Sequence, residues 1–237
     1  MKGKLYLIPT TLGDNNPLDV LPIKVKDIID QTNHFIVENE KSARRFIKKI
    51  SPDKNQSELI LYPLDKRVGD IDTNGYLDIC NKELNIGLLS EAGVPAIADP
   101  GAIIVELAHK KNIRVVPLVG PSSILLAMMS SGFNGQNFSF NGYLPIDSKE
   151  RKFALKNLEK LSKDKSQSQI FIETPYRNDK MFGDLLQILH PNTKLCIAAD
   201  ITLKDEYIRT LSIKEWKNIA KPQLHKRPTI FIIHKFY

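Results

Sequence analysis

The sequence contains little cysteine. Only Cys80 and Cys196 occur among 237 residues, and they lie far apart within apolar segments. This pattern indicates neither a disulfide framework nor a thiolate zinc site. The five histidines show no HxxxH or HxH spacing, so we expect no metal site. Such cysteine usage predicts a protein of the reducing cytoplasm.

Long hydrophobic runs are also missing. The apolar stretch 118–129 is interrupted by Gly120 and Pro121, and it is shorter than the roughly 18 residues that suggest a membrane span. We therefore expect a soluble protein with no membrane association. We also expect no signal peptide before the strand-like segment 5–8.

Several common catalytic and nucleotide-binding signatures are absent. The chain has no GxGxxG after its first strand, and it has no GxxxxGK[ST], GxSxG or HExxH. These signatures are the usual sequence evidence for dinucleotide binding, nucleoside triphosphate binding, serine hydrolases and zinc proteases. The chemistry therefore has to be sought in less common motifs.

The amino-acid composition is typical of a folded, basic protein. Hydrophobic residues make up 42% and charged residues 26% of the chain, which argues against a disordered or collagen-like protein. Lysine and arginine total 34 against 27 aspartates and glutamates, a formal net charge of +7. This charge favours anionic partners without identifying them.

Short strand-like runs alternate with segments of helical periodicity, which predicts an α/β protein built from βαβ units around a largely parallel sheet. In the first half we expect strands at 5–8, 34–37, 59–62, 86–89 and 114–116, and helices near 18–30, 42–50, 70–81 and 102–111. In the second half we expect strands at 138–143, 169–173, 194–200 and 229–233, and helices at 122–131, 148–161, 178–190 and from Ser212. The change of composition after residue 117 predicts two domains, 1–117 and 118–237.

The most informative loop is Ser90–Gly101, which follows a buried strand and precedes a helix. Loops at this position bind ligands in open α/β sheets. The small residues Ala92, Gly93 and Ala96 would let a ligand approach the backbone, and two prolines would hold the loop's shape in advance. A plain connection between strand and helix is about equally compatible, although the loop is long for one.

Two further loops carry candidate residues. In Pro117–Ser123, a serine could cap the following helix, or the free N–H groups at the helix start could face a polar ligand, and capping alone explains the serines. A third loop leaves a strand with Glu173, Thr174 and Arg177. A surface ion pair between Glu173 and Arg177 is the simpler account of that loop.

Taken together, these segments resemble one known family. The matching motifs follow one order along nearly the whole chain: Leu5–Thr10 with Gly13, Ser90–Gly101, Ile113–Pro121, Gly142–Pro145 with Ser148, Lys149 and Arg151, and Phe171–Thr174 with Arg177. They resemble the tetrapyrrole-methylase superfamily of S-adenosylmethionine (SAM)-dependent methyltransferases. The greatest similarity is to the branch that 2′-O-methylates a cytidine ribose in bacterial small-subunit ribosomal RNA.

The resemblance implies two α/β domains with a SAM-binding cleft between them, and a homodimer. Transferred by position, it implies these cofactor-binding residues: Pro9, Ser90, Glu91, Ala92, Gly93, Val94, Ile97, Gly120, Ser122, Ser123, Thr174, Ala198, Ala199, Pro228 and Thr229. Much of this contact should come from backbone and small side chains. The sulfonium methyl is already activated, so the enzyme mainly has to align a nucleophile and exclude water.

Three segments depart from the family pattern. Where the ribosomal RNA branch has Glu-Asp-Thr-Arg, this chain has Glu38-Asn39-Glu40-Lys41. The branch's Arg-Glu-Leu-Thr-Lys appears here as Ala199-Asp200-Ile201-Thr202-Leu203, and its Gly-Glu before the last strand appears as Arg227-Pro228. The SAM-binding half of the pattern is therefore better kept than the half expected to hold RNA and assist deprotonation.

Three functions fit these observations. The first is ribose 2′-O-methylation of RNA, with ribosomal RNA or the small ribosomal subunit as partner. It agrees with the basic runs at 41–49 and 148–152, although such runs are usually solvated helix faces. The second is methylation of a tetrapyrrole or another small acceptor. The third is a SAM-binding protein that has lost catalysis, which the altered segment 200–203 motivates.

Methylation of a ribose hydroxyl needs a proton acceptor near the transferring methyl. Glu38, Glu173 and Asp200 end predicted strands, and of these Glu173 matches the family pattern most closely. We take Glu173 as the base, Arg177 as its orienting partner and Glu38 as the second candidate. The sequence leaves the acceptor atom, the base and the oligomeric state open.

Overall fold

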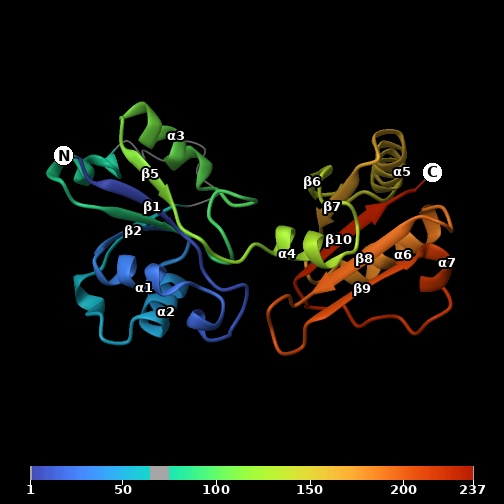
Figure 1. Ribbon diagram of the computed structural model, residues 1–237, viewed down its shortest axis with the longest axis horizontal. Coiled ribbons are helices and arrows are strands. Elements are labelled where there is room, and N and C mark those ends of the chain that lie inside the picture. The colour runs from blue at the N-terminus through green and yellow to red at the C-terminus, as the bar shows by residue number, and fades with distance from the viewer. Residues whose placement is uncertain (1, 65–74, 237) are drawn as a thin grey trace. The chain divides into compact units, whose positions relative to one another are not determined.

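The computed structural model describes residues 2–64 and 75–236. The chain divides into two compact units, Met1–Ser122 (unit 1) and Ser123–Tyr237 (unit 2), as Figure 1 shows. Each unit contains one five-stranded sheet with helices packed on it. The predicted α/β class is confirmed, with one parallel and one mixed sheet. The domain boundary expected after residue 117 stays a prediction.

The sheet of unit 1 is parallel and has the strand order β3-β2-β4-β1-β5. Its strands are β1 (Lys4–Ile8), β2 (His34–Val37), β3 (Ile60–Pro63), β4 (Ile86–Leu89) and β5 (Arg114–Pro117). Because β4, β1 and β5 are adjacent and parallel, the loops that follow them emerge side by side at one edge. This is the edge at which open α/β sheets bind ligands.

Helices cover both faces of this sheet. They are α1 (Ile23–Asp30), α2 (Glu40–Ile50) and α3 (Ala102–Lys110), with the 3₁₀ helices η1 (Pro17–Asp19), η2 (Gln56–Glu58) and η4 (Asp78–Lys82). Side chains alternate along a strand, so Tyr6 and Ile8 of β1 pack with α1 and α2, whereas Leu5 packs with α3. Both faces are therefore buried, which holds the strand ends in place.

Two helix predictions for unit 1 need correction or limitation. The helix expected over 18–30 is wrong at its start, because Pro22 adopts a non-helical conformation (φ −59°, ψ 147°) and α1 begins only at Ile23. Residues 65–74, which include the start of the helix expected over 70–81, lie outside the described residues. The C-terminal end of that expected helix lies in the described part of the chain, where η4 forms a 3₁₀ helix in place of an α-helix.

The sheet of unit 2 has the order β6-β7-β10-β8-β9. Its strands are β6 (Phe138–Tyr143), β7 (Ser168–Ile172), β8 (Lys194–Ala199), β9 (Tyr207–Ser212) and β10 (Thr229–His234). The pair β6–β7 is parallel, whereas the other three pairings are antiparallel. A largely parallel sheet is therefore wrong for this unit. Strand β9, which the sequence analysis missed, folds back on β8, and β10 enters between β7 and β8 in the opposite direction.

Helices α5 (Ser148–Lys165), α6 (Asn178–Ile188) and α7 (Ile213–Trp216) pack against one hydrophobic core of unit 2, and α4 (Ser123–Ser130) contacts β10. In the core, Phe171 stacks on Phe231, and Phe182 meets Trp216 edge-on. The helix start expected at Ser212 is confirmed, because Ser212 and Glu215 form a capping box. In the described part of the chain, no helix is long and apolar enough to cross a membrane.

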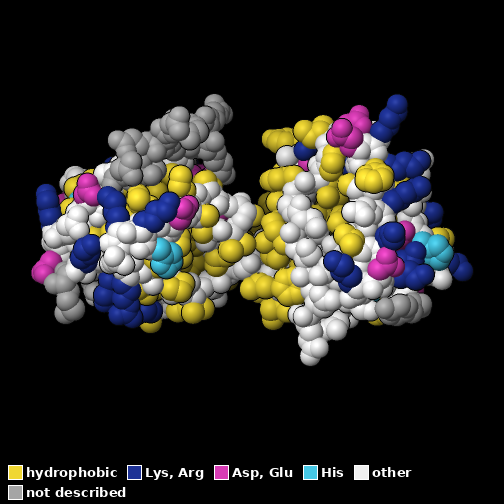
Figure 2. Space-filling view, turned by 90° about the horizontal axis from the view of Figure 1, so that it is seen from above, with side chains coloured by type: hydrophobic (Ala, Val, Ile, Leu, Met, Phe, Trp, Pro, Cys, Tyr) yellow, Lys and Arg dark blue, Asp and Glu magenta, His cyan; other side chains and the backbone are white. Residues whose placement is uncertain are grey.

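The lysines of α5 are exposed, and Figure 2 shows lysine and arginine side chains gathered on this side of unit 2. Arg151 is different, because it is only 3% exposed. Its guanidinium lies 2.7 and 2.6 Å from Asp184 Oδ2, and it donates to the carbonyl oxygens of Pro145 and Ile146 at 3.1 and 2.6 Å. This one side chain therefore ties α5 to α6 and to the segment that precedes α5.

We expect Arg151→Ala to lower the free energy of unfolding of unit 2 by about 3 kcal/mol, because it leaves the Asp184 carboxylate without its cation. The chain's single tryptophan, Trp216, is buried in this unit, so urea unfolding followed by its fluorescence reports on unit 2. The control is Lys152→Ala at the exposed neighbouring position, where we expect a change within about 0.5 kcal/mol. Equal unfolding midpoints for the two variants would contradict the structural role of Arg151.

Candidate functional site

The loops after β1 and β4 are hydrogen-bonded to each other at the carboxyl edge of the unit 1 sheet. The Thr10 amide donates to the Gly93 carbonyl oxygen at 2.9 Å, and the Ser90 hydroxyl donates to the same oxygen at 2.5 Å. The Thr10 and Ser90 hydroxyls lie 3.4 Å apart. Thr10 and Ser90 are both buried. These bonds bring the predicted site residues Ser90 and Gly93 into one rigid structure.

The loop after β5 packs on the other two loops through glycines. A Cβ atom at Gly120 would lie 2.3 Å from the Cβ and Cγ atoms of Pro9, so no larger residue fits there. Gly93 has φ +79°, and a Cβ atom there would lie 3.2 Å from the Pro121 carbonyl oxygen. Both glycines are therefore required by contacts within the protein itself. The expectation that Gly93 lets a ligand approach the backbone stays a prediction beside this structural role.

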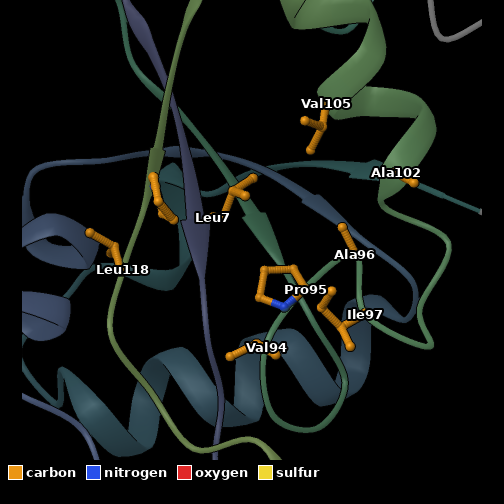
Figure 3. A pocket seen from close by; sticks show the side chains of 9 residues that line it. Leu7, Val94, Pro95, Ala96, Ile97, Ala102, Val105 and Leu118 are labelled. Carbon is orange, nitrogen blue, oxygen red and sulfur yellow. The ribbon is translucent and has the colours of Figure 1, made fainter. Parts of the chain in front are cut away.

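An apolar pocket of about 360 Å³ opens beside these loops, and Figure 3 shows how its side chains lie. It is lined by Leu7, Val94, Pro95, Ala96, Ile97, Ala102, Val105, Pro117 and Leu118. These residues come from the ends of β1 and β5, from the loop after β4 and from α3. Val94 and Ile97, two of the predicted cofactor-binding residues, line the pocket, and the Ile97 side chain is 55% exposed. The pocket falls in the size range of small-molecule sites, about 300–1,000 Å³.

The loop 90–101 holds an uncommon backbone conformation. Ala96 and Ala98 both lie in the left-handed region, with φ of +66° and +57°, which costs a non-glycine residue on the order of 1–3 kcal/mol. The carboxylate of Asp99 offsets part of this cost by accepting hydrogen bonds from the backbone amides of Gly101, at 3.2 Å, and Ala96. Backbone strain of this kind concentrates at binding and catalytic sites.

Asp99 also contacts Glu38, the acid that follows β2. The two side chains share a hydrogen bond, and both are half-buried. Burial, together with the hydrogen bond and the charge of Glu38, raises the pKa of Asp99 to about 6. The structure therefore places Glu38 against the loop 90–101.

In unit 2, Glu173 and Arg177 follow β7 and form an ion pair. Glu173 Oε1 accepts three hydrogen bonds, from the Thr174 amide at 2.6 Å and from Arg177 Nε and Nη2 at 3.0 and 2.6 Å. The Glu173 side chain is only 2% exposed, against 32% for Arg177. The simpler account of a surface ion pair is therefore wrong, because the carboxylate is buried. A buried carboxylate that is held by an arginine has a defined orientation. Such a group can accept a hydrogen bond from a ligand or accept a proton in a reaction.

The remaining unit 2 residues of the predicted set meet at the same sheet edge. Thr229 pairs with Ala199 across β10 and β8, and Ile230 pairs both with Ala198 and with Ile172, the residue before Glu173. Ala198 and Ala199 have no exposed surface. The Pro228 carbonyl oxygen accepts from the amide of Asp200 at 2.9 Å. These residues therefore adjoin Glu173 through strand pairing.

Four predicted residues lie at the margins of these clusters. Glu91 and Ala92 are exposed, and Glu91 accepts a hydrogen bond from Ser42 of α2 at 2.9 Å. Ser122 is buried at the end of unit 1, whereas Ser123 is the first residue of α4 and belongs to unit 2.

Comparison with known proteins gives a consistent result. No protein-family model matches the sequence. The chain is 29% identical over 237 residues to the ribosomal RNA small subunit methyltransferase I of Buchnera aphidicola subsp. Schizaphis graminum, covering 99% of this chain and 79% of the relative. The crystal structure of the methyltransferase CobJ matches 98% of this chain and 94% of its own, with a TM-score of 0.65 at 15% identity. The uroporphyrin-III-C-methyltransferase of Thermus thermophilus matches 99% of this chain and 95% of its own, with a TM-score of 0.58 at 14% identity.

The chain has the tetrapyrrole-methylase fold. It is a distant homologue of the curated small-subunit ribosomal RNA methyltransferases. The sequence analysis did not include Asp99 among the candidate site residues. Its signal was present in the Asp99-Pro100-Gly101 turn, but a local motif does not reveal the contact with Glu38.

The Asp99–Glu38 contact predicts how stability depends on pH. Since the pKa of Asp99 is raised from 3.8 to about 6, this carboxyl group binds more proton in the folded protein than in the unfolded chain between these values. This contribution therefore destabilises the fold as the pH rises from about 4 to about 6. We expect Glu38→Gln to make the decline shallower, because it removes the neighbouring acid that raises this pKa.

Thermal unfolding of the wild type and Glu38→Gln at several pH values measures the difference. Glu91→Gln, in the same loop but exposed, is the matched control and should keep the wild-type profile. Parallel curves for the wild type and Glu38→Gln across this range would show that the two carboxyl groups do not interact.

Proposed function

We propose that this protein is a SAM-dependent methyltransferase that 2′-O-methylates a cytidine ribose in small-subunit ribosomal RNA. The carrying observation is the convergence of the loops after β1, β4 and β5 at the carboxyl edge of the unit 1 sheet, beside an apolar pocket. The names of the curated relatives and the net positive charge support RNA as the acceptor.

The pocket fits one part of SAM. Its lining is aliphatic, with small side chains at Ala96 and Ala102, so it suits the flat ring of an adenine base. The neighbouring backbone of 90–93 and 120–122 would hold the polar parts of the cofactor, as the resemblance implies. When bound, SAM supplies a methyl group that is already activated by its sulfonium centre. The protein's own task is then to bind, orient and exclude water.

In this proposal Glu173 accepts the proton of the ribose hydroxyl. Three N–H donors hold its Oε1 atom, so the orientation of the whole carboxylate is determined. Arg177 is a positioning residue, because it acts through Glu173. Glu38 contributes through Asp99 to the shape of the loop 90–101. This role differs from that of the second candidate base, which the sequence analysis gave to Glu38. The homodimer implied by the family resemblance stays a prediction.

A substitution at the mouth of the pocket tests SAM binding. We expect Ile97→Arg to weaken SAM binding about 10-fold or more, because it removes apolar contact and places a cation near a cationic ligand. Because Ile97 is exposed, we expect the variant to fold, so a weaker affinity would report on the binding site itself. Ile103→Arg is the matched control, since Ile103 is 51% exposed on α3 and does not line the pocket. Equal affinities in calorimetry for both variants would remove the pocket from the cofactor site.

Transfer of labelled methyl from SAM tests the acceptor. Intact small ribosomal subunits, naked ribosomal RNA and a porphyrinogen are offered separately, and we expect label in RNA, at a cytidine ribose that resists alkaline cleavage. Glu173→Gln keeps the shape of the side chain and should lower turnover by about 10²–10⁴-fold, with SAM affinity nearly unchanged. Label in the porphyrinogen alone would replace RNA by a tetrapyrrole acceptor. SAM binding without transfer to any acceptor would indicate lost catalysis.

A further inference from the structure

An exposed aromatic side chain follows Glu173 in the chain and lies against a histidine and a lysine. Tyr176 is 71% exposed, although it lies in a turn whose backbone is well bonded. His225 meets its ring edge-on at a centroid distance of 5.9 Å, and Lys226 Nζ lies 6.0 Å from the ring centroid. We call these three residues the Tyr176 platform. At this exposure, much of the tyrosine ring is open to a planar ligand.

The platform is held in place by its backbone. The Lys226 amide donates to the Pro175 carbonyl oxygen at 2.9 Å, and Asn178 Nδ2 donates to the Arg227 carbonyl oxygen at 2.7 Å. The Leu224 amide donates to Asp179 Oδ1 at 3.3 Å. These three bonds join the segment after β7 to the segment before β10. The backbone that carries Tyr176 and Lys226 is thus fixed before any ligand binds, which reduces the entropy cost of binding.

A cavity of about 570 Å³ adjoins the platform. It is lined by Asp179, Phe182, Lys221, Pro222, Gln223, His225 and Arg227. Arg227 is already engaged by Asp200 and by the carbonyl oxygens of Gln223 and Asp205. Lys221 and Lys226 are exposed and, among the described residues, form no ion pair with a carboxylate, so their charges are available to an anion.

We propose that the Tyr176 platform binds single-stranded RNA, with one base stacked on the Tyr176 ring and the adjoining phosphates held by Lys226 and Lys221. Base stacking on an exposed aromatic ring combined with lysines that follow the backbone is how proteins bind single strands. The inference deepens the proposed function, because it takes RNA as the substrate class and assigns residues of unit 2 to hold it. A partner protein with an acidic surface would use the lysines but would gain little from the open ring.

The test measures binding of a fluorescently labelled 12-nucleotide oligocytidylate to the full chain by anisotropy, without SAM. We expect Tyr176→Ala to weaken binding by about 5- to 150-fold, the range that stacking of a base provides. Tyr176→Phe retains the ring and should bind nearly as the wild type does. The matched control is Phe153→Ala, which removes a similarly exposed aromatic ring (76%) among the lysines of α5. It should change affinity little.

Two further measurements separate the contribution of base stacking from that of the phosphate contacts. On a strand of the same length that lacks its bases, Tyr176→Ala should have no effect, because only the phosphates remain to be bound. Lys226→Gln should reduce the salt dependence of binding by about 0.7 in the slope of log K against log salt, the contribution of one phosphate contact on a single strand.

The outcomes distinguish this inference from the proposed function. If the wild type methylates RNA while Tyr176→Ala and Phe153→Ala bind the oligonucleotide equally, the platform is overturned and the methyltransferase stands. If Tyr176→Ala alone loses the oligonucleotide while the wild type methylates no RNA, the platform stands and the acceptor is wrong. Equal dependence on Tyr176 for binding a polyglutamate peptide would overturn RNA in favour of an acidic protein.

Discussion

The close approach of Gly120 to Pro9 is the constraint on which the unit 1 site depends. A Cβ atom at position 120 would overlap the proline ring at 2.3 Å, so the loops after β5 and β1 can meet only if residue 120 is glycine. That contact places Pro121 against Gly93, and Gly93 in turn receives hydrogen bonds from Thr10 and Ser90. The strand order makes these loops neighbours, and the glycines let them touch.

The loop 90–101 combines strain with an acid that compensates for it. Left-handed conformations at Ala96 and Ala98 would be unfavourable in an isolated peptide. Asp99 bonds to backbone amides on both sides and meets Glu38 from the end of β2. Ala96 and Ile97, which line the apolar pocket, therefore lie in a loop whose conformation depends on Asp99, and the contact of Asp99 with Glu38 links this loop to the end of β2.

Two of the departures from the family pattern contact each other. Asp200 lies in the segment that lacks the family's arginine and lysine, and Arg227 stands where the family has a small residue. In the structure the Arg227 guanidinium pairs with Asp200 and donates to the carbonyl oxygens of Gln223 and Asp205. Arg227 thus supplies a positive charge next to Asp200. The turn after β8 remains anchored, which weakens the case that this region has degenerated.

The sequence by itself determined the elements whose signals are local. Strands β2, β4 and β6 occupy the predicted ranges, and α7 begins at its capping box, because short runs of strand-forming residues and helix capping involve only nearby residues. The family motifs also located the loops of both candidate clusters. The tertiary structure decided the antiparallel entry of β10, the hairpin strand β9 with its weak alternation around Arg209, the burial of Glu173 and the meeting of Asp99 with Glu38. Each of these joins segments that are distant in sequence, and such contacts depend on strand order and side-chain packing, which no local pattern encodes.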